Sequence, residues 1–180
     1  ILIDVAIGIA MEMHRGVGRA LDGPVYVLYP VPKIALLPVL MLLMGLGNTS
    51  KVVLIVIIIL FQFLLAARDG ARSIPASLLL SARSLQLRGA SAVRHVVLPA
   101  ILPRLFSALR LSLGISFSVV FFAESFATSY GIGFFIVNAW AQLAYLDMYA
   151  GIVALGLAGF LLFRLVDSLE RRSCPWMVAP

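Results

Sequence analysis

The sequence is poor in charged residues and has a single cysteine. Charged side chains make up 12% of the 180 residues and apolar residues 62%, whereas an average soluble domain is about 25% charged and about 45–50% apolar. A soluble chain of this composition would expose more apolar surface than water tolerates. The one cysteine, Cys174, excludes an internal disulfide and a metal site built from several cysteines. The composition therefore predicts a membrane protein.

Several catalytic motifs are also missing. There is no G-x-x-x-x-G-K-[ST] phosphate loop, so we expect the chain not to hydrolyse ATP. There is no H-E-x-x-H zinc helix, and the two histidines, His14 and His95, lie far apart. A G-x-S-x-G nucleophile motif is absent as well. We therefore expect no enzyme, no metal site and no cofactor. The net charge of +6 includes no basic run interleaved with aromatic residues, which argues against a nucleic-acid partner.

Five apolar segments predict membrane helices, because a backbone in lipid must satisfy its own hydrogen bonds. The first, residues 1–11, is shorter than the roughly 20 residues needed to cross a bilayer, and we expect it to be the end of a helix that begins outside this sequence. The other four segments cover residues 25–47, 52–67, 105–127 and 143–163. Pro30, Pro32 and Lys33 interrupt the first of these four. We predict an all-α, polytopic helix bundle that forms one N-terminally truncated transmembrane domain over residues 1–180.

Basic residues are distributed unequally between the two ends of these segments. If the segments alternate in direction, one side receives Arg15, Arg19, residues 68–104 and the Arg171–Arg172 pair, while Lys51 is the only basic residue of the other side. Lysine and arginine are enriched in cytoplasmic loops. The asymmetry therefore predicts that residues 68–104 and the C-terminus are cytoplasmic.

The cytoplasmic segment, residues 68–104, is about 37 residues long and therefore too long for a bare connector. Residues 77–88 are predicted to form a short amphipathic helix, with Pro75 just before its start. Its serines share one face, and Leu78, Ala82 and Leu85 share another. Such a helix either lies on lipid or docks a partner protein, and the pattern alone does not separate these two functions.

Two charged residues lie inside the predicted spans, where ionisable side chains are often functional. Arg110 is six residues beyond Arg104 and can extend its side chain to the cytoplasmic interface or line a pathway. Glu124 is twenty residues beyond Arg104, roughly 30 Å along a helix, and is therefore expected near the outer face. For Glu124, a role as a gate and a role in helix anchoring or an ion pair both stay open.

The segment ARSLQLRGASAVRHVVLPAILP (residues 82–103) resembles, in register and without gaps, the cytoplasmic "EAA" loop of permease subunits of binding-protein-dependent ABC importers. Further segments resemble the nitrate, sulfonate and taurine branch of that family. They are YPVPKIALLP (29–38), GLGNTSK (45–51), RSIP (72–75), LRLSLG (109–114), Ala123–Glu124, GIG (131–133) and Glu170–Arg171–Arg172. The resemblance covers nearly the whole chain.

The loop departs from the family pattern at two positions. The family's loop glutamate falls on Leu80 and its loop glycine on Gln86, while Gly89 resembles a second glycine of this branch. By resemblance, the residues of the loop that couple to an ATPase are Leu80, Ala82, Arg83, Leu85, Gln86 and Gly89. Arg110 and Glu124, as ionisable residues within the predicted spans, are the candidates for the translocation pathway or its gate.

The resemblance implies the type I ABC importer fold, with a short cytoplasmic coupling helix, in the bacterial inner membrane. It also implies three kinds of protein partner, namely a second permease copy, an ABC ATPase subunit and a solute-binding protein. The transported solute would be a small nitrate-, sulfonate- or taurine-like anion or a related compound. Two alternatives stay open at this point: a fragment of a secondary transporter and a membrane scaffold that transports nothing.

Overall fold

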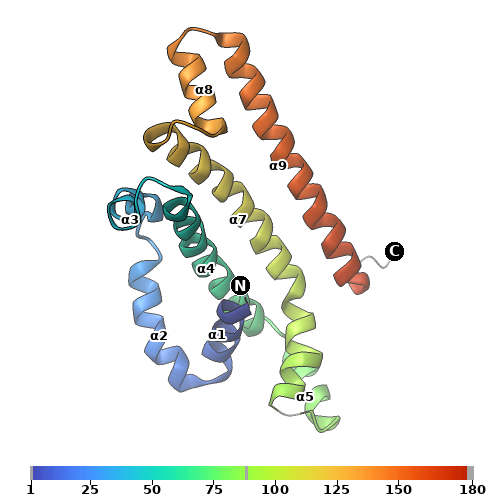
Figure 1. Cartoon of the computed structure of the whole chain (residues 1–180). Coiled ribbons are helices and arrows are strands. Elements are labelled where there is room, and N and C mark those ends of the chain that lie inside the picture. The colour runs from blue at the N-terminus through green and yellow to red at the C-terminus, as the bar shows by residue number, and fades with distance from the viewer. Residues whose placement is uncertain (1, 88, 178–180) are drawn as a thin grey trace. The chain divides into compact units, whose positions relative to one another are not determined.

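The computed structural model describes residues 2–87 and 89–177, and all regular structure in this part of the chain is helical (Figure 1). The helices are α1 (Leu2–Met13), α2 (Arg15–Leu28), α3 (Leu37–Met44), α4 (Asn48–Arg72), α5 (Ala76–Ser84), α6 (Ala90–Ala92), α7 (Leu98–Ala127), α8 (Ile132–Ala141) and α9 (Tyr145–Ser173). Short 3₁₀ turns cover Lys33–Leu36 and Pro175–Met177, and Val93–Val97 is a π-helix. The prediction of an all-α chain is confirmed.

Within the described residues, three helical stretches are long and apolar enough to cross a membrane. They are Asn48–Arg72, Ala90–Ser125 and Tyr145–Ser173. Each is longer than the apolar segment predicted from the sequence, because charged and small residues at the ends of a helix continue its hydrogen bonding beyond the lipid-facing stretch. The broken pair Gly16–Leu28 and Lys33–Met44 gives a fourth possible span.

The prediction of one helix over residues 25–47 is wrong. Helix α2 ends at Leu28, and helical structure resumes only at Lys33. Pro30 and Pro32 explain the break, since proline donates no backbone hydrogen bond and disfavours helical geometry in the residue before it. Residues 132–141, which none of the predicted apolar segments covers, form α8. This helix has ten residues, too few for a criterion based on spanning length to detect.

The described residues form two compact units. Unit 1 comprises residues 1–31, 59–109 and 168–180, and unit 2 comprises residues 32–58 and 110–167. Helices α4, α7 and α9 each contribute residues to both units. That the two units form a single transmembrane domain stays a prediction.

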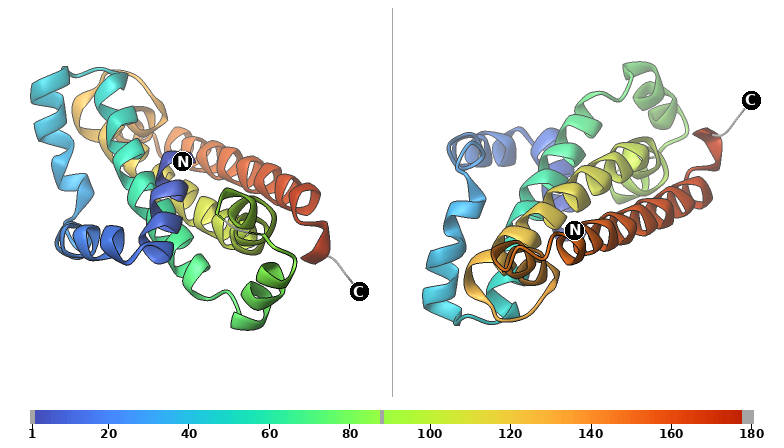
Figure 2. Two further views of the ribbon diagram at one scale, coloured as in Figure 1. Left: turned by 90° about the horizontal axis from the view of Figure 1, so that it is seen from below. Right: turned by 90° about the horizontal axis from the view of Figure 1, so that it is seen from above.

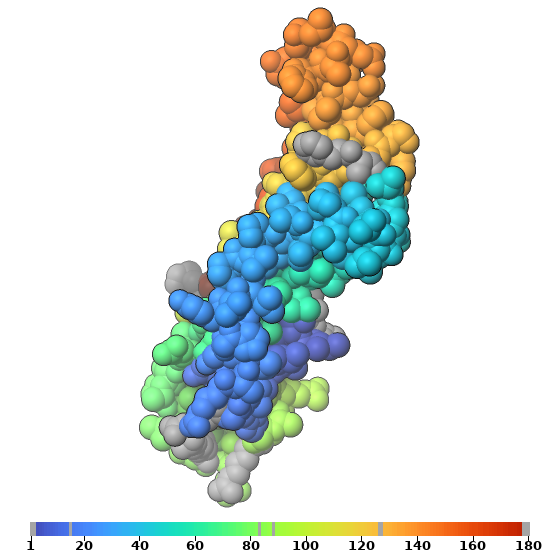
Figure 3. Space-filling model, turned by 90° about the vertical axis from the view of Figure 1, so that its left-hand side faces the viewer, coloured from blue at the N-terminus to red at the C-terminus, as the bar shows by residue number. Residues whose placement is uncertain are grey.

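Unit 1 is held together by an apolar cluster from α1, α4, the π-helix and the start of α7. Its buried members are Val5, Ile9, Phe63, Ala67, Val97, Ile101 and Leu105. Helix α1 lies directly beside α4 (Figure 2) because Gly8 lets the two backbones approach. A Cβ atom at Gly8 would overlap the carbonyl oxygen of Leu64, so only glycine fits there. On the face shown in Figure 3, α2 lies at the surface.

Unit 2 has its own apolar cluster, formed by α3, α4 and α7. Its buried members are Leu37, Leu40, Leu54, Ile58, Val119 and Ala123. The α8–α9 hairpin packs through Gly151, whose missing side chain leaves room for Phe135 and Ile136 of α8 (Figure 1). The start of α8 lies at the C-terminal end of α7, where Gly133 contacts Glu124.

Candidate functional site

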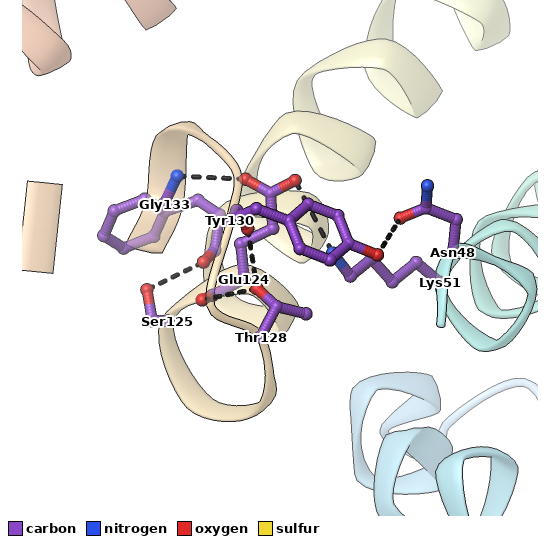
Figure 4. Close-up of polar contacts among 8 residues, drawn as sticks. Asn48, Lys51, Glu124, Ser125, Thr128, Tyr130 and Gly133 are labelled. Carbon is purple, nitrogen blue, oxygen red and sulfur yellow. Dashed lines mark hydrogen bonds and ion pairs between the residues drawn. The ribbon is translucent and has the colours of Figure 1, made fainter. Parts of the chain in front are cut away.

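A polar cluster in unit 2, here called the Glu124 cluster, joins α7, α4 and the start of α8 (Figure 4). The Glu124 carboxylate accepts a hydrogen bond from the backbone N–H of Gly133 at 3.0 Å. Its other oxygen lies 3.7 Å from Nζ of Lys51. The two side chains are 14% and 6% exposed, respectively, so both charges are largely withdrawn from solvent. A charge buried in this way is stable only when it is paired.

Tyr130 and its neighbours complete the Glu124 cluster. The Lys51 ammonium lies 5.0 Å from the centre of the Tyr130 ring, within range of a cation–π interaction. The Tyr130 hydroxyl donates to Oδ1 of Asn48 at 3.2 Å. The Thr128 hydroxyl lies 3.2 Å from the carbonyl oxygen of Glu124 and 2.7 Å from that of Tyr130 (Figure 4). Three segments quoted above for the family resemblance, residues 45–51, 123–124 and 131–133, thus meet in one place.

Two glycines are required for this geometry. Gly131 has φ +111°, a conformation that side chains with a Cβ rarely adopt, and a Cβ there would overlap the Glu124 carboxylate. A Cβ on Gly133 would lie 2.5 Å from the carbonyl oxygen of Phe121. The turn before α8 can therefore close over Glu124 only with glycine at both positions. Of the two roles left open for Glu124, the structure contains the ion pair; a role as a gate stays a prediction.

Arg110 of α7 pairs with a residue that the sequence analysis did not single out. Its Nε donates to Oδ1 of Asp167 on α9 at 2.8 Å. An apolar medium favours such pairing between charged residues of neighbouring spans. Nothing in the spacing of charges along the chain indicated Asp167, because the pair joins residues 57 positions apart. The assignment of Arg110 to a translocation pathway stays a prediction.

The loop residues assigned by resemblance fall into two groups in unit 1. Leu80 and Leu85 are 60% and 74% exposed, whereas Ala82 is 5% exposed. The Arg83 side chain lies outside the described residues. Ala82 lines a cavity of about 650 Å³, together with residues of α1, of the end of α4 and of the π-helix. Ala82 is therefore covered by the chain itself, whereas Leu80 and Leu85 are accessible. Which of these residues contact an ATPase stays a prediction.

The end of α5 requires an unusual backbone conformation at Gln86. The N–H of Leu87 donates to the carbonyl of Ala82, five residues earlier, which is the bond that closes a Schellman motif. Gln86 has φ +58°, and glycine is the residue that usually fills this position. Gly89 also has a positive φ of +54°. The departure at Gln86, found by resemblance, therefore falls on a position where glycine is structurally favoured.

Gln86→Gly should stabilise the end of α5 by about 1 kcal/mol, because a residue with a Cβ atom is disfavoured in the left-handed backbone conformation and glycine is not. Gly89→Ala should destabilise the loop by about 1–3 kcal/mol, because alanine would have to adopt the positive φ of Gly89. Hydrogen–deuterium exchange of residues 76–92 measures both effects. Exchange should be slower in Gln86→Gly and faster in Gly89→Ala. Ser84→Gly is the matched control, since glycine inside the last helical turn should speed exchange. Faster exchange in Gln86→Gly would contradict the assignment of the motif.

The π-helix at Val93–Val97 links this loop to α7. The N–H of Leu98 donates to the carbonyl of Val93, five residues earlier. The following Pro99 explains this geometry, because a proline cannot donate to the carbonyl four residues before it and would clash with that carbonyl in a regular α-helix. The wider turn moves the His95 carbonyl away from the proline ring. Pro99 therefore sets the connection between the loop and the membrane helix.

Among the described residues, no group of three or more histidine, cysteine, aspartate or glutamate side chains could hold a metal ion. Cys174 is buried. Burial raises the pKa of its thiol, and the Glu170 carboxylate raises that pKa further. A thiol with a raised pKa and no solvent access reacts slowly with alkylating reagents. Cys174 therefore has the properties of an inert structural residue.

The three helical stretches of the described residues that are long and apolar enough to cross a membrane define a multi-pass membrane protein. The chain belongs to the family described as binding-protein-dependent transport system inner membrane component, whose model matches residues 4–175. This confirms the resemblance noted on the sequence. It also gives the fold, which is that of a type I ABC importer permease, and the location in the inner membrane.

Three curated relatives illustrate the similarity. The taurine transport system permease protein TauC of Escherichia coli strain K12 is 35% identical over 177 residues, which are 98% of this chain and 64% of the relative. The putative aliphatic sulfonates transport permease protein SsuC of Bacillus subtilis strain 168 is 30% identical over 97% of this chain and 63% of its own. The bicarbonate transport system permease protein CmpB of Synechococcus elongatus is 29% identical, with 94% and 62% covered. The chain thus spans less than two thirds of the length of these relatives.

Proposed function

We propose that this chain is the membrane-spanning permease subunit of an ATP-driven ABC importer. The match of the family model to residues 4–175 carries this proposal. In this function the chain forms part of the translocation pathway and performs no chemistry itself. A second permease copy completes the pathway, a separate ATPase subunit hydrolyses ATP, and a solute-binding protein delivers the solute. Taurine, aliphatic sulfonates and bicarbonate in the names of the relatives favour a small solute with an anionic group.

ATP-dependent uptake tests this proposal. Proteoliposomes that contain the whole transporter should accumulate radiolabelled solute only with ATP on the side of the ATPase, and only with the binding protein on the opposite side. Helices α2 and α3 form a broken pair. Discontinuous spans of this kind are also common in secondary transporters. Uptake that follows an imposed ion gradient and ignores ATP would therefore favour a secondary transporter and contradict the proposal.

The proposed orientation places the predicted cytoplasmic segment, residues 68–104, and the C-terminus in the cytoplasm, which the excess of basic residues supports. Single cysteines at Asn48 or Ser129, in a Cys174→Ser background, should react with a membrane-impermeant maleimide in intact cells. A cysteine at Ser91 should react only after the cells are lysed. All three positions are exposed, so access to the reagent depends on the membrane rather than on protein packing. Labelling of Ser91 from outside, with protection of Asn48, would reverse the orientation.

A further inference from the structure

The Lys51 ammonium of the Glu124 cluster has no hydrogen-bond acceptor among the residues that the structure describes. Its Nζ atom is buried, and the whole side chain is 6% exposed. The Glu124 carboxylate lies 3.7 Å away, which is close enough for an ion pair but longer than a hydrogen bond. An ammonium has three N–H donors, and buried donors without acceptors cost free energy. Such a group in a native protein indicates that a water, an ion or a ligand completes it.

The Glu124 carboxylate, in contrast, is held by the start of α8. The backbone N–H of Gly133, the second residue of α8, donates to Oε2 of Glu124 at 3.0 Å. The N-terminus of a helix also carries a partial positive charge, which stabilises a carboxylate in this position. Lys51 can therefore turn to another acceptor while the hydrogen bond and the helix dipole that stabilise Glu124 stay in place.

Lys51 lies in the first turn of α4, a turn that contains no acidic residue. A lysine there adds to the partial positive charge of the helix N-terminus and does not balance it. Helix N-termini are suited to anions, because their backbone N–H groups and their dipole both favour negative charge. A buried ammonium without an acceptor and the N-terminus of α4 thus meet at one place, and both favour an anion.

Tyr130 covers this place. Its ring lies 5.0 Å from the Lys51 ammonium, and its hydroxyl donates to Oδ1 of Asn48 at 3.2 Å (Figure 4). The Tyr130 and Asn48 side chains are both exposed, so their hydrogen bond competes with water. Displacement of the Tyr130 ring would therefore break only a weak contact, and it would open the ammonium to solvent.

We propose that Lys51, Tyr130 and Asn48, here called the Lys51 site, bind the anionic group of the transported solute on the side from which it enters. The inference rests on the proposed function and on the proposed orientation, in which Lys51 is the only basic residue of the outer side. The anionic group displaces the Tyr130 ring and accepts hydrogen bonds from the ammonium. Glu124 keeps its bond to Gly133.

Thiol labelling of the complete transporter tests whether the ammonium is available to anions. The thiol introduced by Asn48→Cys, in a Cys174→Ser background, is treated with 2-sulfonatoethyl or 2-(trimethylammonio)ethyl methanethiosulfonate. Adding Lys51→Met together with Glu124→Gln leaves the net charge unchanged. It should nevertheless lower the ratio of the anionic to the cationic rate about fivefold, the effect of one nearby charge on reagents of opposite sign in water. Arg164→Gln, the loss of an exposed cation in the C-terminal half of α9, is the control.

Coupled uptake tests whether the Lys51 site binds the solute. The probes are taurine, ethanesulfonate and bicarbonate, each supplied with saturating loaded binding protein. For every probe that the unmodified transporter takes up, the double variant Lys51→Met with Glu124→Gln should lower uptake per ATP hydrolysed about tenfold, the value of one hydrogen bond to a charged group. Lys51→Arg should retain most of the uptake, because it keeps the cation. A purely structural defect would lower uptake and ATP hydrolysis together and leave their ratio unchanged.

The outcomes separate the site from the function. If the unmodified transporter takes up no solute with ATP, the proposed function fails and the inference fails with it. If ATP drives uptake but the double variant leaves either the labelling ratio or the uptake per ATP unchanged, the inference alone is overturned, and water alone completes the ammonium. If the double variant fails to fold, Lys51→Gln, which leaves the bond between Glu124 and Gly133 in place, should lower uptake per ATP to the same extent; an unchanged value overturns the proposal.

Discussion

Replacing Glu124 by glutamine is expected to lower the thermal unfolding midpoint of the purified protein by about 6–12 °C. The substitution removes the charge that faces the Lys51 ammonium at 3.7 Å and leaves that ammonium buried without a counter-charge. Breaking a buried ion pair from one side costs about 3–5 kcal/mol. For a chain of this length each kcal/mol corresponds to about 2–4 °C, and 3 kcal/mol gives the stated shift.

The double variant Glu124→Gln with Lys51→Met should recover most of this loss, because it removes both charges together. Asp69→Asn is the control for the loss of a carboxylate, since Asp69 is exposed, and it should shift the midpoint little. A midpoint for Glu124→Gln within about 2 °C of the unmodified protein would contradict the structural role of the ion pair. If that variant also lost uptake, the role of Glu124 as a gate would be supported instead.

Replacing Leu85 or Leu80 by glutamate is expected to release the ATPase subunit while the membrane helices still fold and insert. Both leucines are largely exposed in unit 1, so a charged side chain there costs the isolated chain little. In the proposed interface with an ATPase, the same charge would be buried without a partner, at a cost of several kcal/mol. Since 1.4 kcal/mol is a factor of ten, affinity should fall a hundredfold or more.

Ser81→Glu is the matched control, because Ser81 lies in the same helix, is exposed and donates its hydroxyl to the carbonyl of Ser77. It should retain the ATPase. Ala82→Glu should act differently from the leucine variants, since Ala82 is buried and a charge there would disturb the loop itself. Copurification of the ATPase with each tagged variant, at equal expression, measures these effects. Retention of the ATPase by both leucine variants would reject docking through this exposed face.

The apolar segments allowed the long helices to be predicted, because their hydropathy depends on local composition. The apolar run in α4 and the run before Arg164 in α9 both lie within helices of the structure. The prolines at 30 and 32 were recognised as an interruption of one segment, but the sequence analysis still treated it as one span. Helix α8 was missed because it has only ten residues, and the prediction looked for apolar segments long enough to span a membrane.

The candidate sites could be predicted only in part. Glu124 and Arg110 stood out because charged residues in apolar segments are rare. Their partners Lys51 and Asp167 did not, since both pairs join helices that are distant in sequence, and tertiary packing determines which residues meet. Ala82 was assigned to an apolar face together with Leu78 and Leu85, and helical periodicity identifies such a face without showing what covers it. The structure places Ala82 toward the chain's own cavity, whereas Leu78 and Leu85 of the same face are exposed.

The most direct test of the proposed importer subunit is copurification of the unmodified, tagged chain from its native membrane in a mild detergent. The account predicts that an ATPase subunit is recovered with the chain, that all ATP hydrolysis belongs to that subunit, and that the chain by itself binds no nucleotide. Recovery of a transport-competent protein without any ATPase, or saturable ATP binding by the isolated chain, would contradict it.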